Sequence, residues 1–362
     1  MNQDESLISG NMPLESAMDS WRLSRRRFVL ALLGLAGVVS AGLTSTSTGS
    51  RALAASMPPA GGSERGHSAL VADPRADAQR QAREARAGQQ FVNEWNDPHL
   101  RERDFTFSSG DAVIRAYEAR FDIGKLAETA RQVTGADTPM VGMSDAEVPI
   151  PLVIIIHDTG LTDHARRIAR RIALNARVAC AIDLFSRDGG SDQSVSTERR
   201  ALLDARASTF FLPDIQAAIE FYRSQPYADA NELGMLGFGF GGGVTWQAVV
   251  SMPGLRAAVC FYGESPEPSS LANARAAVLG VYSSDPTDAA NQGRGELADA
   301  LAANGIQHHI VVHPSTRSGF FDETGPTYNS LATARAWSDV DGWYRRHLSM
   351  GSRDMLTPKE RR

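Results

Sequence analysis

Length, composition and charge describe a chain that can bury a large core and that has no basic surface for nucleic acid. The chain has 362 residues, of which 42% are hydrophobic and 22% are charged, and this favours one principal domain once non-globular ends are removed. The formal net charge of −5 excludes the strongly basic balance typical of DNA- and RNA-binding proteins.

The N-terminal region predicts an export signal. Three arginines at 25–27 precede an apolar stretch at 28–43, which is shorter than the roughly 20 residues of a membrane span and suits the hydrophobic region of a signal peptide. The run "SRRRFV" resembles the twin-arginine export signal, and "ALAA" offers a cleavage site after Ala54. We therefore predict a signal peptide over 1–54, recognition by the twin-arginine translocation machinery, and a periplasmic or extracellular location. A signal-anchored form is the alternative.

Two further segments are predicted to lie outside the folded domain. Residues 55–102 form the first: a linker rich in Pro, Gly, Ser and Ala is predicted at 55–75, and a polar helix at 76–95. The tail 349–362 has no hydrophobic periodicity, so we predict that it is disordered.

The two cysteines predict neither a disulfide nor a metal site. Cys180 and Cys260 both lie inside apolar runs, where a buried free thiol is the usual state. We predict no cofactor either.

The remainder of the chain predicts an α/β fold. From Arg103, alternating polar and apolar residues around Ser-Gly-Asp predict a β-hairpin, and an insert at 121–149 follows, partly helical at 124–134. Apolar runs then predict strands at 152–157, 178–185, 233–238, 256–263, 276–283 and 308–313. Helices are predicted at 162–175, 210–224, after residue 243, at 292–303 and at 330–347.

This alternation predicts a mainly parallel central sheet with helices on both faces. Ligands of such folds bind beyond the carboxyl ends of the strands. We therefore expect one rim to hold His157, Asp158, the turn at 237–243, Glu264, Asp285 and Ser318.

The glycine-rich turn "GFGFGGG" at 237–243 fits two chemistries. Gly237, Gly239 and Gly242 match the G-x-G-x-x-G of dinucleotide sites, with Glu264 placed where a ribose-binding acid would lie. The same turn also matches a nucleophile elbow, G-x-[S/C]-x-G, in which Gly239 stands where the attacking residue would be. A single G-x-G-x-x-G is a weak signal, so the elbow is the preferred interpretation and nucleotide binding stays an alternative.

Four stretches resemble the dienelactone hydrolase family of α/β-hydrolases. "IHDTGL" is similar to the family's H-E-x-x-G-L, "GFGFGGG" to G-F-C-x-G-G-G, and "AAVCFYG" to A-A-V-x-F-Y-G. The stretch "SGFFDETGPTYNSLATARAW" keeps the spacing of H-G-F-x-N-D-T-x-P-R-Y-x-x-x-A-A-x-x-A-W. The resemblance implies an α/β-hydrolase domain over 103–348 and a family activity on esters and lactones.

Carried over position by position, the resemblance implies a degenerate catalytic triad. The nucleophile position falls on Gly239 and the base position on Ser318. The acid falls on Asp285, with Asp288 as the second candidate because the spacing departs by one residue.

The pocket positions follow from the same resemblance. Asp158 takes the place of the family's strand-end glutamate, and Arg187 loosely matches an arginine that some members use for the substrate carboxylate. His157, Phe238 and Phe240 flank these positions and complete the expected pocket.

Glycine has no atom that can attack an ester, and a serine hydroxyl is not a base near pH 7. The sequence therefore predicts a catalytically inactive protein that binds a small ligand non-covalently. The alternative is a carboxylic-ester or lactone hydrolase, similar to carboxymethylenebutenolidase, that uses displaced residues. The displaced candidates are His157 or His313 as base and Ser284 or Ser318 as nucleophile.

Overall fold

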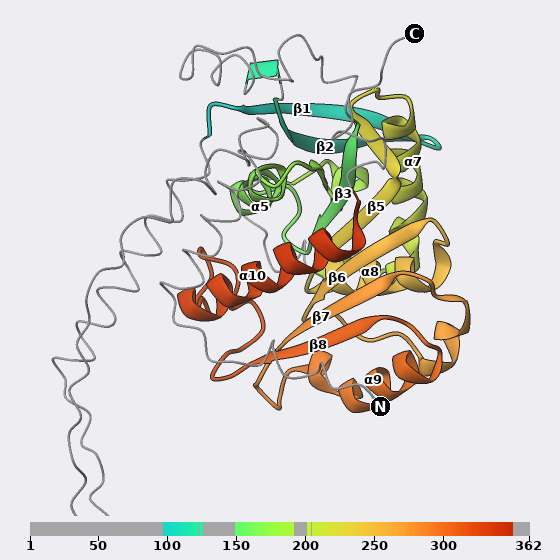
Figure 1. Ribbon diagram of the computed structural model, residues 1–362, viewed down its shortest axis with the longest axis vertical. Coiled ribbons are helices and arrows are strands. Elements are labelled where there is room, and N and C mark those ends of the chain that lie inside the picture. Colours follow the sequence, from blue (N-terminus) through green and yellow to red (C-terminus); the bar gives the residue numbers. More distant parts are fainter. Residues whose placement is uncertain (1–96, 123, 126–148, 192–200, 204, 350–362) are drawn as a thin grey trace, which may run out of the picture.

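The structure is a computed structural model that describes residues 97–122, 124–125, 149–191, 201–203 and 205–349 (Figure 1). The predicted signal peptide and polar helix lie outside the described residues, as do the C-terminal tail from residue 350 and nearly all of the predicted insert. The first strand begins at Leu100, inside the segment 55–102 that was predicted to lie outside the folded domain.

In the described part of the chain, eight strands form one sheet in the order β1-β2-β4-β3-β5-β6-β7-β8. Their bounds are β1 Leu100–Ser109, β2 Ala112–Phe121, β3 Ile150–His157, β4 Val178–Ile182, β5 Ala228–Phe238, β6 Leu255–Phe261, β7 Ala277–Ser283 and β8 His308–His313. The strands from β3 to β8 pair in parallel, whereas β2 pairs antiparallel with both β1 and β4. The predicted, mainly parallel sheet is confirmed.

The first two strands form the predicted hairpin at one edge of this sheet (Figure 1). Ser109 pairs with Ala112, and Gly110 in the turn has a φ of +60°, which a glycine adopts without the steric cost of a β-carbon. The hairpin extends the parallel sheet, so its apolar side chains join the core of the domain.

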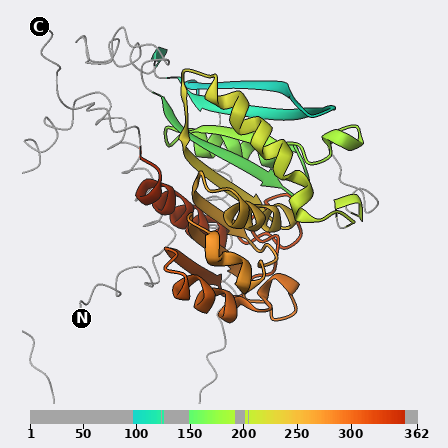
Figure 2. The same cartoon turned by 90° about the vertical axis from the view of Figure 1, so that its right-hand side faces the viewer.

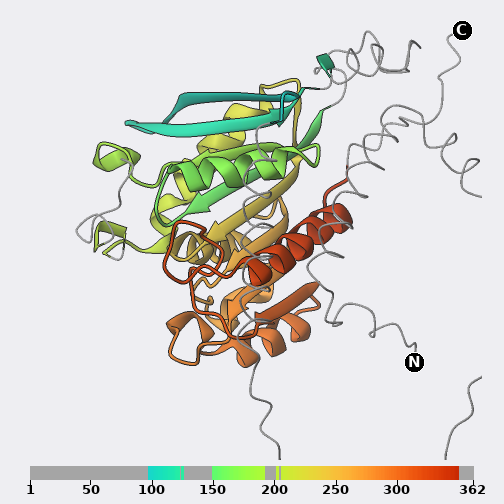
Figure 3. The ribbon, with the colours of Figure 1, turned by 90° about the vertical axis from the view of Figure 1, so that its left-hand side faces the viewer.

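Helices cover both faces of the sheet (Figures 2 and 3). The hydrophobic cluster on one face includes apolar side chains of α7, α8 and α9, and the cluster on the other face includes those of α5 and α10. The bounds are α5 Asp163–Ala173, α7 Leu212–Arg223, α8 Phe240–Ser251, α9 Arg294–Ala303 and α10 Ser330–His347. All five were predicted from the sequence to within a few residues.

The central strands end where helices begin, and this positions the site. β3 is buried along its whole length and ends at His157, and β5 runs through Phe238 directly into the turn before α8. Their registers match His157 with Phe238, so the residues that follow the two strands lie side by side.

Among the described residues, no helix is both long and apolar enough to cross a membrane. The apolar stretch 28–43 lies outside those residues.

Candidate functional site

A cavity of about 810 Å³ opens at the carboxyl ends of the parallel strands. Its lining comes from the residues that follow β3, β5, β6, β7 and β8, together with two residues that precede α7. Of the residues expected to share this rim, the cavity is lined by His157, Asp158, Gly239, Phe240, Gly243, Glu264 and Ser318.

The turn between β5 and α8 has the geometry of a nucleophile elbow. Gly239 has a φ of +55° and a ψ of −122°, and its N–H donates to the carbonyl of Phe261 at 3.1 Å. An L-residue rarely adopts this conformation, and α/β-hydrolases hold their nucleophile in such a turn at a cost of about 1–3 kcal/mol. Glycine therefore relieves the strain at this position, and it also removes the attacking atom.

Internal packing accounts for the other glycines of the turn. A β-carbon on Gly237 would lie 2.1 Å from the carbonyl oxygen of Gly241, and one on Gly242 would lie 2.7 Å from that of Phe261. These contacts are with the protein's own backbone, so the G-x-G-x-x-G spacing needs no bound nucleotide to explain it. The structure therefore removes the main support for the nucleotide alternative.

The carboxylate of Asp158 lies directly over the elbow. A β-carbon on Gly239 would lie 2.2 Å from Asp158 Oδ2. The Asp158 side chain is 12% exposed, and its Oδ1 lies 3.1 Å from Nδ1 of His157. A carboxylate thus occupies the space that the first atoms of a nucleophile side chain would fill.

His157 is buried and held in one orientation. Its Nδ1 accepts the N–H of Thr159 at 3.2 Å and lies 2.8 Å from the Thr159 hydroxyl, and its ring stacks on Phe238 at 5.0 Å between centroids. Because Nδ1 accepts the Thr159 N–H, the hydrogen-bond network assigns the proton of the neutral ring to Nε2. The ring therefore lines the cavity beside Asp158 in a fixed orientation.

Asp288, the second candidate for the acid position, lies beside Ser318. Asp288 Oδ2 accepts both the N–H and the hydroxyl of Ser318, each at 2.9 Å, and it also accepts the hydroxyl of Ser283. Asp288 and Ser318 both line the cavity. The structure therefore brings these two expected positions together.

Asp285, the first choice for the acid, does not line the cavity, and this corrects the expectation. Its Oδ1 accepts the hydroxyl and the N–H of Thr287, and Arg317 lies 3.1 Å from its Oδ2. The Thr287 hydroxyl and N–H, with the Arg317 charge, lower the pKa of Asp285. Its carboxylate thus shapes a turn after β7, and Asp288 takes the place beside Ser318.

Two other expected pocket residues also lie away from the cavity. Arg187 donates from Nη2 and Nε to the carboxylate of Asp214, at 2.7 and 3.2 Å. Phe238 is fully buried beneath His157. Phe240, in contrast, lines the cavity as expected.

Of the displaced bases and nucleophiles, His157 and Ser318 line the cavity. His313 is buried against Phe320, where burial lowers its pKa to about 4, and it does not contribute to the lining. The hydroxyl of Ser284 accepts the N–H of Thr316 and likewise lies outside the lining.

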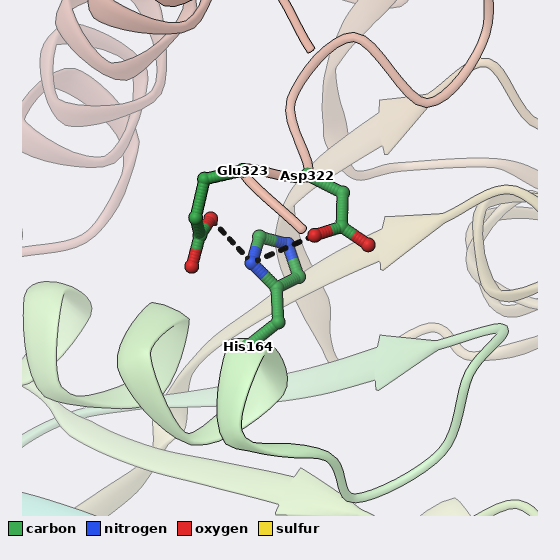
Figure 4. Close-up of side chains that lie close together, drawn as sticks. All are labelled: His164, Asp322 and Glu323. Atoms are coloured by element: carbon green, nitrogen blue, oxygen red, sulfur yellow. Dashed lines mark ion pairs between the residues drawn. The ribbon is translucent and has the colours of Figure 1, made fainter. Parts of the chain in front are cut away.

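A cluster beside the cavity was not anticipated from the sequence (Figure 4). His164, at the start of α5, meets Asp322 and Glu323 from the loop before α10, and their ligand atoms lie within 4.8 Å of one another. His Nδ1 lies 2.6 Å from Glu323 Oε2 and 3.5 Å from Asp322 Oδ1. One imidazole and two carboxylates are donors that a divalent cation such as Zn²⁺ accepts.

An ion-pair network explains this cluster without a metal. The guanidinium of Arg167 contacts the other oxygen of Glu323, so a cation there would meet a carboxylate whose charge is already offset. Burial alone would raise the pKa of Glu323. The contacts with His164, and to a smaller extent with Arg167, instead lower this pKa to about 2. The network ties α5 to the loop that carries Ser318.

Comparisons with known proteins identify the family of the chain. A model of the dienelactone hydrolase family matches residues 139–348. A protein of Salmonella typhi named "putative carboxymethylenebutenolidase" is 28% identical over 211 residues, which cover 54% of this chain and 77% of the relative.

Solved structures show the same fold. A "putative dienelactone hydrolase" of Klebsiella pneumoniae superposes with a TM-score of 0.57 at 23% identity, covering 68% of this chain and 99% of that one. A dienelactone hydrolase-like promiscuous phosphotriesterase from metagenomic libraries gives a TM-score of 0.55 at 19% identity, covering 69% and 100%. The family model spans more than half of the sequence, and the chain therefore belongs to the dienelactone hydrolase family.

Proposed function

We propose that the protein hydrolyses carboxylic esters or lactones, and that the attacking group is a water molecule activated by the Asp158 carboxylate. Membership of a family of ester and lactone hydrolases supports the reaction class, as does the name of the relative from Salmonella typhi. The observation that carries the proposal is the position of Asp158 Oδ2 over the Cα of Gly239.

The reaction needs a base at the point from which attack starts. In a covalent hydrolase that point is the side-chain oxygen or sulfur of the elbow residue. Here a carboxylate oxygen of Asp158 lies at that point, and it can accept a proton from water. The elbow residue itself offers neither a thiol nor a hydroxyl. The Asp158 side chain is only 12% exposed, so the surrounding residues limit the positions that its carboxylate can take.

The step balances without a covalent intermediate. As the water oxygen bonds to the carbonyl carbon, Asp158 takes one of its protons, and the carbonyl oxygen becomes an oxyanion. When the intermediate collapses, the carbon–oxygen bond to the alcohol breaks and the leaving alkoxide takes the proton from Asp158. The products are the carboxylic acid and the alcohol, and the Asp158 carboxylate is regenerated.

The start of α8 supplies the donor for the oxyanion. The first N–H groups of a helix have no acceptor inside it, and in the α/β-hydrolase elbow the N–H of the residue after the nucleophile binds the oxyanion. That residue is Phe240, which begins α8 and lines the cavity.

Hydrolysis of p-nitrophenyl butyrate by the purified protein tests the proposal. A positioned general base contributes about 10²–10⁴-fold, so we expect slow, saturable hydrolysis in the native protein and a loss of at least about 100-fold in Asp158→Asn. The matched control is Asp285→Asn, which removes a carboxylate outside the cavity and should leave kcat/KM within about twofold. Equal rates for the native protein and Asp158→Asn would refute the proposal.

A second candidate is a protein that binds a small ligand without turning it over. It is favoured by Gly239, which has no nucleophile, and by the Ser318 hydroxyl, which is hydrogen-bonded to Asp288 and cannot serve as a base. Hydrolysis of the butyrate ester at the rate of the buffer alone, together with saturable binding of butanamide seen by NMR, would favour this candidate.

We also propose that the chain is exported in folded form by the twin-arginine pathway. The support is the motif "SRRRFV" ahead of the apolar stretch 28–43. Replacing Arg25 and Arg26 together with lysine should retain the protein in the cytoplasm of a bacterial host, whereas Arg27→Lys should not. Export of the double variant at the native level would contradict the proposal.

A further inference from the structure

The charges that line the cavity are predominantly negative. Four carboxylates contribute to the lining, and Arg206 is the one arginine or lysine among the described lining residues. The four carboxylates belong to Asp158, Glu264, Asp288 and Asp322.

Arg206 is already committed to a carboxylate. Its Nη1 and Nη2 bind the two oxygens of Asp188 at 2.6 and 2.8 Å, and its guanidinium lies over the ring of Phe210. This bidentate pair occupies the Nη1/Nη2 edge of the guanidinium, and the charge of Asp188 offsets that of Arg206.

Two other arginines near the site also pair with carboxylates. Arg187 binds Asp214 through two nitrogens, whereas the exposed Arg317 contacts Asp285 through Nε. Neither lines the cavity. Among the described lining residues, the only guanidinium is therefore one whose charge is already offset by a carboxylate.

Two of the lining carboxylates also lie near imidazoles. Asp158 Oδ1 is 3.1 Å from His157 Nδ1, and Asp322 Oδ1 is 3.5 Å from His164 Nδ1, which also faces Glu323. Asp288 accepts hydrogen bonds from two serines, which carry no charge, and the exposed Glu264 forms no ion pair with another described residue. A cleft lined by one sign of charge changes the local concentration and association rate of charged ligands by about 10- to 10³-fold. The negative charges of this cleft would therefore oppose the entry of an ester that bears a free carboxylate.

We infer that the cavity accepts neutral or positively charged esters and discriminates against esters that carry a free carboxylate. The inference rests on the proposed function and adds a substrate class to it. Asp158, Glu264, Asp288 and Asp322 repel the anion together, and Glu264 is the one of the four that is exposed.

Three esters with one leaving group and one acyl length test the inference in the native protein. They are p-nitrophenyl butyrate, which is neutral, p-nitrophenyl hemisuccinate, which is anionic, and p-nitrophenyl 4-(trimethylammonio)butyrate, which is cationic. At low salt we expect kcat/KM for the anionic ester to be at least about tenfold below that for the neutral ester, with the cationic ester equal to the neutral one or better. Near 0.5 M NaCl the gap should narrow because screening acts within a few ångströms. A hemisuccinate that equals or exceeds the butyrate would overturn the inference.

A matched pair of variants assigns the effect to the cavity. Glu264→Gln should raise the hemisuccinate-to-butyrate ratio of kcat/KM about two- to fivefold. Glu267→Gln removes the same charge three residues later, outside the lining, and should leave that ratio unchanged. Equal ratios in the two variants would show that overall charge, and not the cavity, causes the discrimination.

Binding of non-hydrolysable amides separates this inference from the proposed function. If no ester is turned over, the hydrolase proposal fails, and selectivity is then read from NMR titrations with butanamide, succinamate and 4-(trimethylammonio)butanamide. Succinamate should bind most weakly of the three. Tightest binding of succinamate would overturn the inference whether or not the protein is an enzyme.

Discussion

Asp158 and Gly239 exclude any further side chain between them: a β-carbon at residue 239 would lie 2.2 Å from Asp158 Oδ2. The missing elbow side chain and the position of the carboxylate are therefore one feature of the site. Restoring a nucleophile requires the carboxylate to move, and moving the carboxylate removes the proposed base.

Gly239→Ala should cost more stability than the backbone conformation alone explains. The comparison is the same substitution in an Asp158→Ala background, because the backbone conformation of residue 239, with φ +55° and ψ −122°, is then common to both and only the carboxylate differs. We expect Gly239→Ala to lower the free energy of unfolding by about 1–3 kcal/mol more in the native background than in the Asp158→Ala background, since Asp158 must be displaced. Urea denaturation measures both losses, and equal losses would show that Asp158 moves without cost.

A covalent mechanism should return only when the space over the elbow is emptied. Gly239→Cys with Ser318→His supplies a nucleophile and a base beside Asp288, yet Asp158 still occupies the position of the new side chain. We expect iodoacetamide to label the introduced thiol slowly in that double variant and at least about tenfold faster once Asp158→Ala is added. Mass spectrometry of the labelled peptide measures the rate, and the buried Cys180 and Cys260 serve as internal unreactive references. Fast labelling of the double variant would contradict the predicted obstruction.

Glu323 should contribute stability that is lost in acid. Its folded pKa is about 2, below the ordinary 4.5, so the contribution is fully present above about pH 4.5 and disappears as the pH falls towards 2. A shift of this size corresponds to about 3 kcal/mol at pH 7. We expect Glu323→Gln to lower the free energy of unfolding by up to that amount at pH 7 and by progressively less below pH 4.5. Glu267→Gln, an exposed control, should show no such trend, and a pH-independent deficit in Glu323→Gln would refute the assignment.

Arg187 should stabilise the fold and leave substrate recognition unchanged. Arg187→Ala removes the guanidinium from Asp214, whose side chain is only 6% exposed, and should lower the free energy of unfolding by about 2–4 kcal/mol. The exposed pair of Arg223 and Glu220 is the control, since Arg223→Ala should cost less than about 0.5 kcal/mol. The hemisuccinate-to-butyrate ratio should not change in Arg187→Ala. A fall in that ratio would assign substrate-carboxylate binding to Arg187 after all.

The strands, the helices and the elbow could be predicted because each depends on local sequence. Continuous apolar runs separated by amphipathic segments predict buried parallel strands, and the glycine-rich turn after β5 predicts a backbone with positive φ at Gly239. The hairpin before the core was equally accessible from its Ser-Gly-Asp turn.

The acid position could not be fixed by spacing alone. Asp285 and Asp288 lie three residues apart, and the choice between them depends on how the loop after β7 folds. Asp285 closes a local turn with the hydroxyl and N–H of Thr287, which is typical of aspartate at turns, and this leaves Asp288 to reach Ser318. The Asp-Pro-Thr turn at 285–287 was visible in the sequence, but the family spacing favoured Asp285 as the acid.

The contacts that decide the chemistry join residues that are distant along the chain. Asp158 meets Gly239 only because β3 and β5 are neighbours in register, and His164 meets Glu323 only because the loop before α10 crosses the start of α5. No local pattern predicts these contacts. They form only in the folded domain, where the ends of neighbouring elements lie close together.

The first turnover of p-nitrophenyl butyrate tests the central claim most directly, because a covalent elbow mechanism releases p-nitrophenol before the acyl group leaves the protein. With excess ester and micromolar protein in a stopped-flow instrument, direct attack by water predicts release that is linear from the start, abolished in Asp158→Asn. A burst of one equivalent of p-nitrophenol, or the same linear rate in Asp158→Asn as in the native protein, would contradict the account.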